Sequence, residues 1–156
     1  MFKKISVAFL VCFCLQLVSF ADDLADVRAF FNRYVEAANG FSKTLPDYYL
    51  TNAKIVRVVE KKDGTTANAI FPMSAYKEQM ASKSGLAKLV KYRNNYKNIN
   101  VKKASNGDYK LTAMRFPNND KEGLACTFVI TKVNNNYKIK EEWMHTKVQD
   151  FLKYVK

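Results

Sequence analysis

The sequence predicts an α+β domain in which a bent antiparallel sheet packs against three N-terminal helices and an extra helix follows at the C-terminus. In the N-terminal part of the chain, apolar residues recur every three or four positions, which is the spacing of one helix face. From residue 88 to residue 145, apolar and polar residues instead alternate between turn-forming residues, as they do in half-buried strands. Residues 22–156 suffice for one domain of this kind and are too few for two.

Residues 1–21 have the layout of a secretory signal peptide. A basic start at Met1–Lys4 precedes the apolar stretch 5–20, and the small residues Ser19 and Ala21 precede a predicted cut after Ala21. The apolar stretch is shorter than the roughly twenty residues that a membrane-spanning helix needs, so an uncleaved anchor is the weaker alternative. We therefore expect a secreted or periplasmic protein, with residues 22–156 forming its single domain.

The predicted first helix covers Asp22–Ala38, and Asn39-Gly40 ends it. A short second helix is expected over Ser42–Leu50. Pro72 can open a third helix, which Gly85 would end. One side of these helices is aromatic or apolar, and we expect it to pack on the sheet. The C-terminal helix is predicted from the spacing of four apolar residues, Val148, Phe151, Leu152 and Val155.

The strands are predicted from β-branched runs and the turns between them. Ala53–Glu60 is such a run, and Thr65–Phe71 returns antiparallel after an Asp-Gly turn. Four longer antiparallel strands are expected at Lys88–Ser105, Tyr109–Phe116, Gly123–Val133 and Tyr137–His145. In the first of these four, the side chains that should face inward change parity partway along, which predicts a β-bulge near Lys97-Asn98 and a bend in the sheet.

Three segments and the order of the elements resemble the nuclear transport factor two-like superfamily, also called cystatin-like or SnoaL-like. The segments are Val27–Tyr34, Leu45–Ile55, and Asn135–Ile139 with the following Trp143. The resemblance implies a cone-shaped curved sheet around the helices, with a conical pocket. It does not imply an activity, because the superfamily includes isomerases, dehydratases, transport factors and assembly modules.

Alternation along the last predicted strand places Tyr137, Ile139, Glu141, Trp143 and His145 on one face, which we expect to meet the helices. In a pocket on that face, Arg115 would anchor an anionic or carbonyl group and the aromatic rings would hold an apolar body. The alternatives are a structural Arg115–Glu141 ion pair, or Glu141 in water. The predicted pocket residues are Tyr92, Tyr96, Arg115, Cys126, Glu141, Trp143 and His145.

The formal net charge of +12 falls to +10 when Lys3 and Lys4 leave with the leader. Such a charge favours anionic partners, such as an envelope surface or an anionic amphipathic ligand. The lysines are scattered and no nucleic-acid-binding motif accompanies them, so no nucleic-acid partner is predicted. The single histidine and Cys126 are too few ligands for a metal site, and neither a metal nor a cofactor is expected.

The leading hypothesis is a secreted or periplasmic non-enzymatic domain. It would bind a small apolar or amphipathic ligand in the cone, or act as an accessory module of an envelope assembly. We assign no catalytic residue, because no aspartate matches those of the superfamily's enzymes. Two alternatives are an isomerase, dehydratase or hydrolase that uses Glu141 with His145 or Tyr92, and a homodimeric interaction module formed through the outer sheet face.

Overall fold

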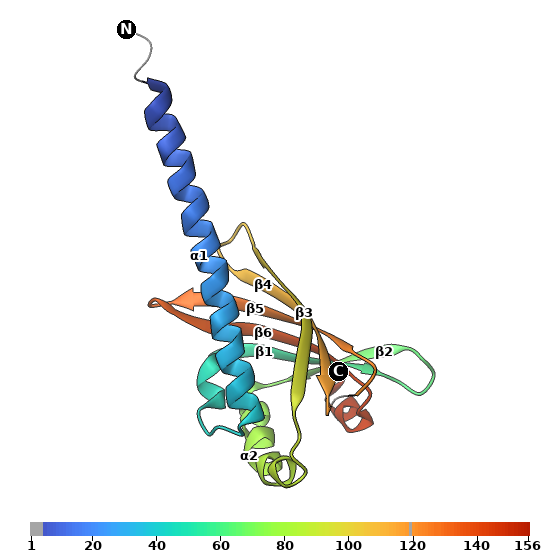
Figure 1. Cartoon of the computed structure of the whole chain (residues 1–156). Coiled ribbons are helices and arrows are strands. Elements are labelled where there is room, and N and C mark those ends of the chain that lie inside the picture. The colour runs from blue at the N-terminus through green and yellow to red at the C-terminus, as the bar shows by residue number, and fades with distance from the viewer. Residues whose placement is uncertain (1–4, 119) are drawn as a thin grey trace.

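The computed structural model describes residues 5–118 and 120–156, and it describes only the backbone of residues 5–21 and 83–86. Within these described residues, the chain forms two α-helices, two 3₁₀ turns and six strands (Figure 1). In chain order these are α1 (Ile5–Asn39), η1 (Leu45–Tyr48), β1 (Tyr49–Glu60), β2 (Thr66–Phe71), α2 (Met73–Leu89), β3 (Asn94–Lys103), β4 (Tyr109–Pro117), β5 (Leu124–Val133), β6 (Asn136–Thr146) and η2 (Gln149–Tyr154).

One curved sheet, with the strand order β2-β1-β6-β5-β4-β3, contains all six strands. Neighbouring strands are antiparallel except β1 and β6, which pair parallel. Figure 1 shows that α1 crosses the sheet and that α2 lies beyond the C-terminal end of α1. The predicted α+β class and the curved sheet around a helix layer are therefore confirmed.

Three predictions about the helices were wrong. The expected helix at Ser42–Leu50 is only η1, because β1 already begins at Tyr49. Helix α2 continues past Gly85 to Leu89, so β3 begins at Asn94 and not at Lys88. A glycine inside a helix costs only about 1 kcal/mol, and α2 ends instead where Lys91 turns to a positive φ of 51°. The expected C-terminal helix is the 3₁₀ turn η2.

Two β-bulges interrupt the antiparallel pairs of the described sheet, and only one was predicted. In β3, Lys97 pairs with Met114 but Asn100 pairs with Thr112, so the expected bulge near Lys97-Asn98 is confirmed. In β6, Ile139 pairs with Ile130 while Glu141 pairs with Val129, which leaves Lys140 as an extra residue. This second bulge reverses the direction of every side chain that follows it in β6.

The core lies between α1 and the concave face of the sheet. Phe31 of α1 is 1% exposed, and its ring centroid lies 5.1 Å from that of Phe128 in β5 and 5.2 Å from that of Tyr96 in β3. From η2, Phe151 packs edge-on against Phe71 of β2 at 5.4 Å. The Phe31 contacts hold the sheet against the C-terminal half of α1, and the Phe151 contact holds η2 against β2.

The predicted leader, residues 1–21, and its cut after Ala21 lie outside the residues whose side chains the structure describes. Within the described residues, no helix combines the length and the apolar character needed to cross a membrane.

Candidate functional site

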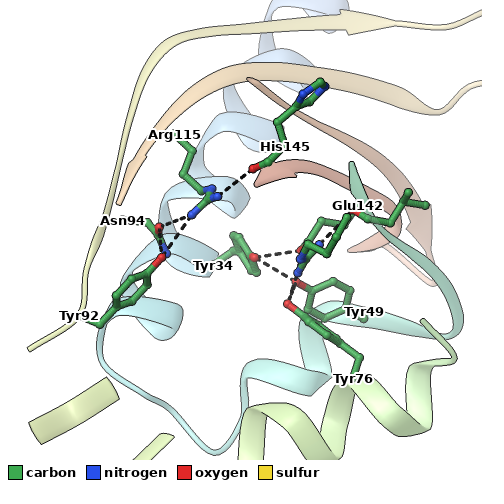
Figure 2. Close-up of polar contacts among 10 residues, drawn as sticks. Tyr34, Tyr49, Tyr76, Tyr92, Asn94, Arg115, Glu142 and His145 are labelled. Carbon is green, nitrogen blue, oxygen red and sulfur yellow. Dashed lines mark hydrogen bonds and ion pairs between the residues drawn. The ribbon is translucent and has the colours of Figure 1, made fainter. Parts of the chain in front are cut away.

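A buried carboxylate, Glu142, lies at the centre of the cone. It follows the Lys140 bulge in β6, so its side chain points toward the helices and is 0% exposed. Arg57 of β1 donates from Nη2 to Glu142 Oε1 at 2.7 Å. Figure 2 shows three tyrosine hydroxyls, from Tyr34, Tyr49 and Tyr76, that point toward the same carboxylate.

The three tyrosines come from three different elements. Tyr34 of α1 donates to Glu142 Oε2 at 3.1 Å, and Tyr49 of β1 donates to the same oxygen. The Tyr76 hydroxyl of α2 lies 3.5 Å from Glu142 Oε1. Both carboxylate oxygens therefore have several donors, as a charge removed from water requires.

The Arg57–Glu142 ion pair keeps the arginine charged despite its burial. Burial alone would lower the pKa of the Arg57 guanidinium, but the adjacent Glu142 carboxylate raises this pKa above its ordinary value. The second Arg57 donor, Nη1, bonds the backbone oxygen of Val56 at 3.2 Å. We name these five residues, Tyr34, Tyr49, Arg57, Tyr76 and Glu142, the buried polar cluster.

The tyrosines of the buried polar cluster make the fold sensitive to alkaline pH. Burial first, and then the Glu142 charge, raise the pKa of Tyr34 and Tyr49 well above 10 and that of Tyr76 to about 12. Because the folded state favours the neutral hydroxyl, this stabilisation is complete below pH 10 and is lost as the pH rises through the folded-state pKa values.

We therefore expect part of the tyrosinate absorbance to appear only at about pH 12 or above, together with the loss of far-UV circular dichroism. As a control, the nine tyrosines of the urea-unfolded chain should titrate near pH 10. Complete ionisation well before pH 12 with unchanged circular dichroism would contradict this burial.

A pocket of about 570 Å³ adjoins the buried polar cluster. It lies among the C-terminal end of α1, η1, α2 and η2, and we name it the mouth pocket. Arg57 and Tyr76 form its inner end, because they are buried while the other lining residues are at least partly exposed. The other lining residues with described side chains are Ala38, Phe41, Ser42, Lys43, Leu45, Pro46, Lys77, Gln79, Met80, Ala81, Ala87 and Phe151.

The size and lining of the mouth pocket can be compared with those of known small-molecule sites. Its volume lies within the roughly 300–1,000 Å³ that is typical of such sites, and its wall combines apolar side chains with a few polar groups. Within the described residues, no group of three or more His, Cys, Asp and Glu side chains could hold a metal ion.

The predicted inward orientation of Glu141, Trp143 and His145 was wrong. All three follow the bulge at Lys140 and lie on the outer face of the sheet, away from the helices. There, Trp143 Nε1 donates to Glu141 Oε2 at 2.9 Å, and Lys54 Nζ lies 4.7 Å from the Trp143 ring centroid. They line a second pocket, of about 390 Å³, which we name the outer groove.

This placement also decides the pairings that involve Glu141. Arg115 does not pair with Glu141, and it donates to Tyr92 Oη at 3.3 Å, to Asn94 Oδ1 at 3.0 Å and to the backbone oxygen of His145 at 3.0 Å. Figure 2 shows the His145 ring directed away from Arg115. A catalytic set of Glu141 with His145 or Tyr92 inside the cone is therefore wrong, because Glu141 and His145 face outward.

The other four predicted residues lie on the inner side of the sheet or at its edge, but none of them lines the mouth pocket. Arg115 is 7% exposed, and Tyr96 packs against Phe31. Cys126 is 3% exposed and donates to the Ala113 backbone oxygen at 3.3 Å. Burial raises the pKa of this thiol to about 12, which is the property of an unreactive core cysteine.

Sequence reasoning missed Arg57 and Glu142 as site residues. Arg57 was detectable in principle, since it is the lone charge in the apolar run Ile55–Val59. Glu142 was not, because Glu141 and Glu142 are chemically identical and only the bulge decides which one faces inward. Tyr34, Tyr49 and Tyr76 belong to the three predicted helices, whose aromatic or apolar sides were expected to pack on the sheet, but nothing in the sequence shows that their hydroxyls meet.

No protein-family model matches this sequence, and no curated protein matches it. Solved structures do match the fold. One is an NTF2-like protein of unknown function from Pseudomonas putida, with a TM-score of 0.60, 10% identity, and coverage of 80% of this chain and 87% of that chain. Another is a domain of unknown function with a cystatin-like fold from Nostoc punctiforme, with a TM-score of 0.54, 16% identity, and coverage of 85% and 84%.

The β subunit of benzoate 1,2-dioxygenase from Burkholderia mallei is also similar, with a TM-score of 0.58, 15% identity, and coverage of 83% of this chain and 93% of that chain. At these identities the likeness concerns architecture alone. The chain therefore has the cystatin-like fold that NTF2-like proteins share.

Proposed function

We propose that this protein is an exported, non-enzymatic module that binds a small apolar or amphipathic molecule in the mouth pocket. The observation that supports this most strongly is the pocket itself, which combines an apolar wall with a polar inner end. The inner end is rigid, because Arg57 and Tyr76 are buried and held by Glu142. A preformed site of this kind binds without a large cost of ordering.

The structure favours binding over catalysis at this position. A general base must be within reach of a substrate proton, but Glu142 is 0% exposed and its oxygens are occupied by Arg57 and the tyrosines. Tyr76 lines the pocket, but its raised pKa of about 12 makes it a neutral hydrogen-bonding group at ordinary pH.

The test is a titration of residues 22–156 with N-phenyl-1-naphthylamine, a neutral dye that fluoresces in apolar surroundings. We expect saturable binding that Met80→Trp weakens about tenfold or more, because the larger ring fills the mouth pocket. The matched control is Ala125→Trp, which adds the same ring in the outer groove and should leave the affinity unchanged. Circular dichroism checks that both variants fold.

Two results of this titration would count against the proposal. One is the absence of saturable binding. The other is binding that only Ala125→Trp weakens, since the dye would then occupy the outer groove.

A second candidate is an interaction module, and the uncovered outer sheet face favours it. The described helices all pack on the opposite face, while Trp143 is held on the outer face between Lys54 and Glu141. A fixed tryptophan on an open surface is typical of an interface anchor. Light scattering distinguishes a homodimer from a monomer, and Trp143→Lys should dissociate a dimer that forms through this face.

A further inference from the structure

We infer that the ligand of the mouth pocket is an anionic amphiphile, a chain with a carboxylate or similar head group, whose head lies at Lys43 and Lys77 and whose tail enters the pocket. This inference rests on the proposed function and adds the chemical class of the ligand. It follows from the charges on the pocket wall and from the way each charge is already bonded.

Every charged side chain that lines the mouth pocket is cationic. The three are Lys43, Arg57 and Lys77, and no Asp or Glu is among the described lining residues. A concave site lined by one sign of charge raises the local concentration of the opposite charge and repels like charge. The pocket therefore favours an anion over a neutral molecule and disfavours a cation.

The three cations are not equivalent. The Arg57 charge is compensated, because Glu142 lies 2.7 Å from its guanidinium. Lys43 and Lys77 are exposed, and within the described part of the chain neither forms an ion pair with a carboxylate. The uncompensated positive charge of the pocket is consequently at its rim and not at its inner end.

Bonding at the inner end excludes the head group from that position. An anion placed beside Arg57 would compete with Glu142 for the same donors, and two carboxylates at one buried site repel each other strongly. A head group at the rim keeps its water on one side and gains Lys43 and Lys77 as partners. The tail then contacts the apolar part of the wall, which includes Phe41, Leu45 and Met80.

The experiment compares three amphiphiles with the same ten-carbon chain: decanoate, decanol and decyltrimethylammonium. Each displaces N-phenyl-1-naphthylamine from residues 22–156, below its aggregation concentration. We expect decanoate to bind tightest and the cation weakest, and we expect added salt to weaken decanoate but not decanol. The double variant Lys43→Gln with Lys77→Gln should weaken decanoate about fivefold to tenfold and weaken neutral decanol much less.

The matched control is Lys97→Gln with Lys102→Gln, which removes the same net charge from the exposed outer face of β3. This control variant should leave the affinities for all three amphiphiles unchanged. If it also weakened decanoate, the effect would come from the net charge of the protein and not from the pocket. Equal affinity for the three amphiphiles, or an equal effect of both double variants, would overturn the head-group assignment while the pocket function stands. Absence of dye binding in the wild-type chain would overturn both proposals.

Discussion

Replacing Glu142 by glutamine should lower the free energy of unfolding by about 3–5 kcal/mol, because it leaves the Arg57 charge buried without its counter-ion. Arginine cannot escape this cost by losing its proton. Arg57 is 8% exposed, and its remaining hydrogen bond goes to the neutral backbone oxygen of Val56. Urea denaturation of residues 22–156, followed by circular dichroism, measures the change.

The neighbouring residue provides a matched control. Glu141→Gln makes the same substitution one position earlier, on the outer face, where a glutamine oxygen can still accept from Trp143 Nε1. Its effect should stay within about 0.5 kcal/mol. Removing both charges, with Arg57→Met and Glu142→Leu together, should cost less than Glu142→Gln alone. Equal losses from Glu141→Gln and Glu142→Gln would show that the bulge at Lys140 is misplaced.

Truncation of Phe128 to alanine should also cost about 3–5 kcal/mol, since it opens a cavity in the aromatic core. Phe128 is 0% exposed, and its ring centroid lies 5.1 Å from that of Phe31 and 5.5 Å from that of Tyr34. Loss of this ring removes its contacts with Phe31 and Tyr34 of α1. Thermal or urea unfolding gives the magnitude.

The control for this truncation is Phe116→Ala, the same change on the outer face of β4. Phe116 is partly exposed, and Lys97 Nζ lies 5.0 Å from its ring centroid. We expect a loss of about 1 kcal/mol. If Phe116→Ala proved as costly as Phe128→Ala, the assignment of the two sheet faces would be wrong.

Much of the fold could be predicted, because its signals are local. The turns at Asp63-Gly64 and Asn106-Gly107 are marked by glycines that adopt φ values of 82° and 85°, which other residues rarely adopt. The bulge near Lys97-Asn98 could be predicted because large apolar residues on either side of it have opposite parity. Element order then followed from the spacing of these signals.

The site could not be predicted in the same way, because it depends on one non-local feature. The Lys140 bulge is set by the pairing of β6 with β5, and no neighbouring residue marks it. Beyond the bulge, the adjacent residues Trp143 and Met144 are both large and apolar, so the alternation of side chains fits either face. The mouth pocket was also missed, because its wall comes from elements that are far apart in the sequence.

The most direct test of the account is a methyl NMR spectrum of residues 22–156 with ¹³C-labelled methionines, recorded while decanoate is added. Met80 lines the mouth pocket, whereas Met114 lies on the outer face of β4. We predict that the Met80 methyl signal shifts with saturable dependence on decanoate and that the Met114 signal does not move. A shift of Met114 without a shift of Met80 would place the ligand on the outer face and contradict the account.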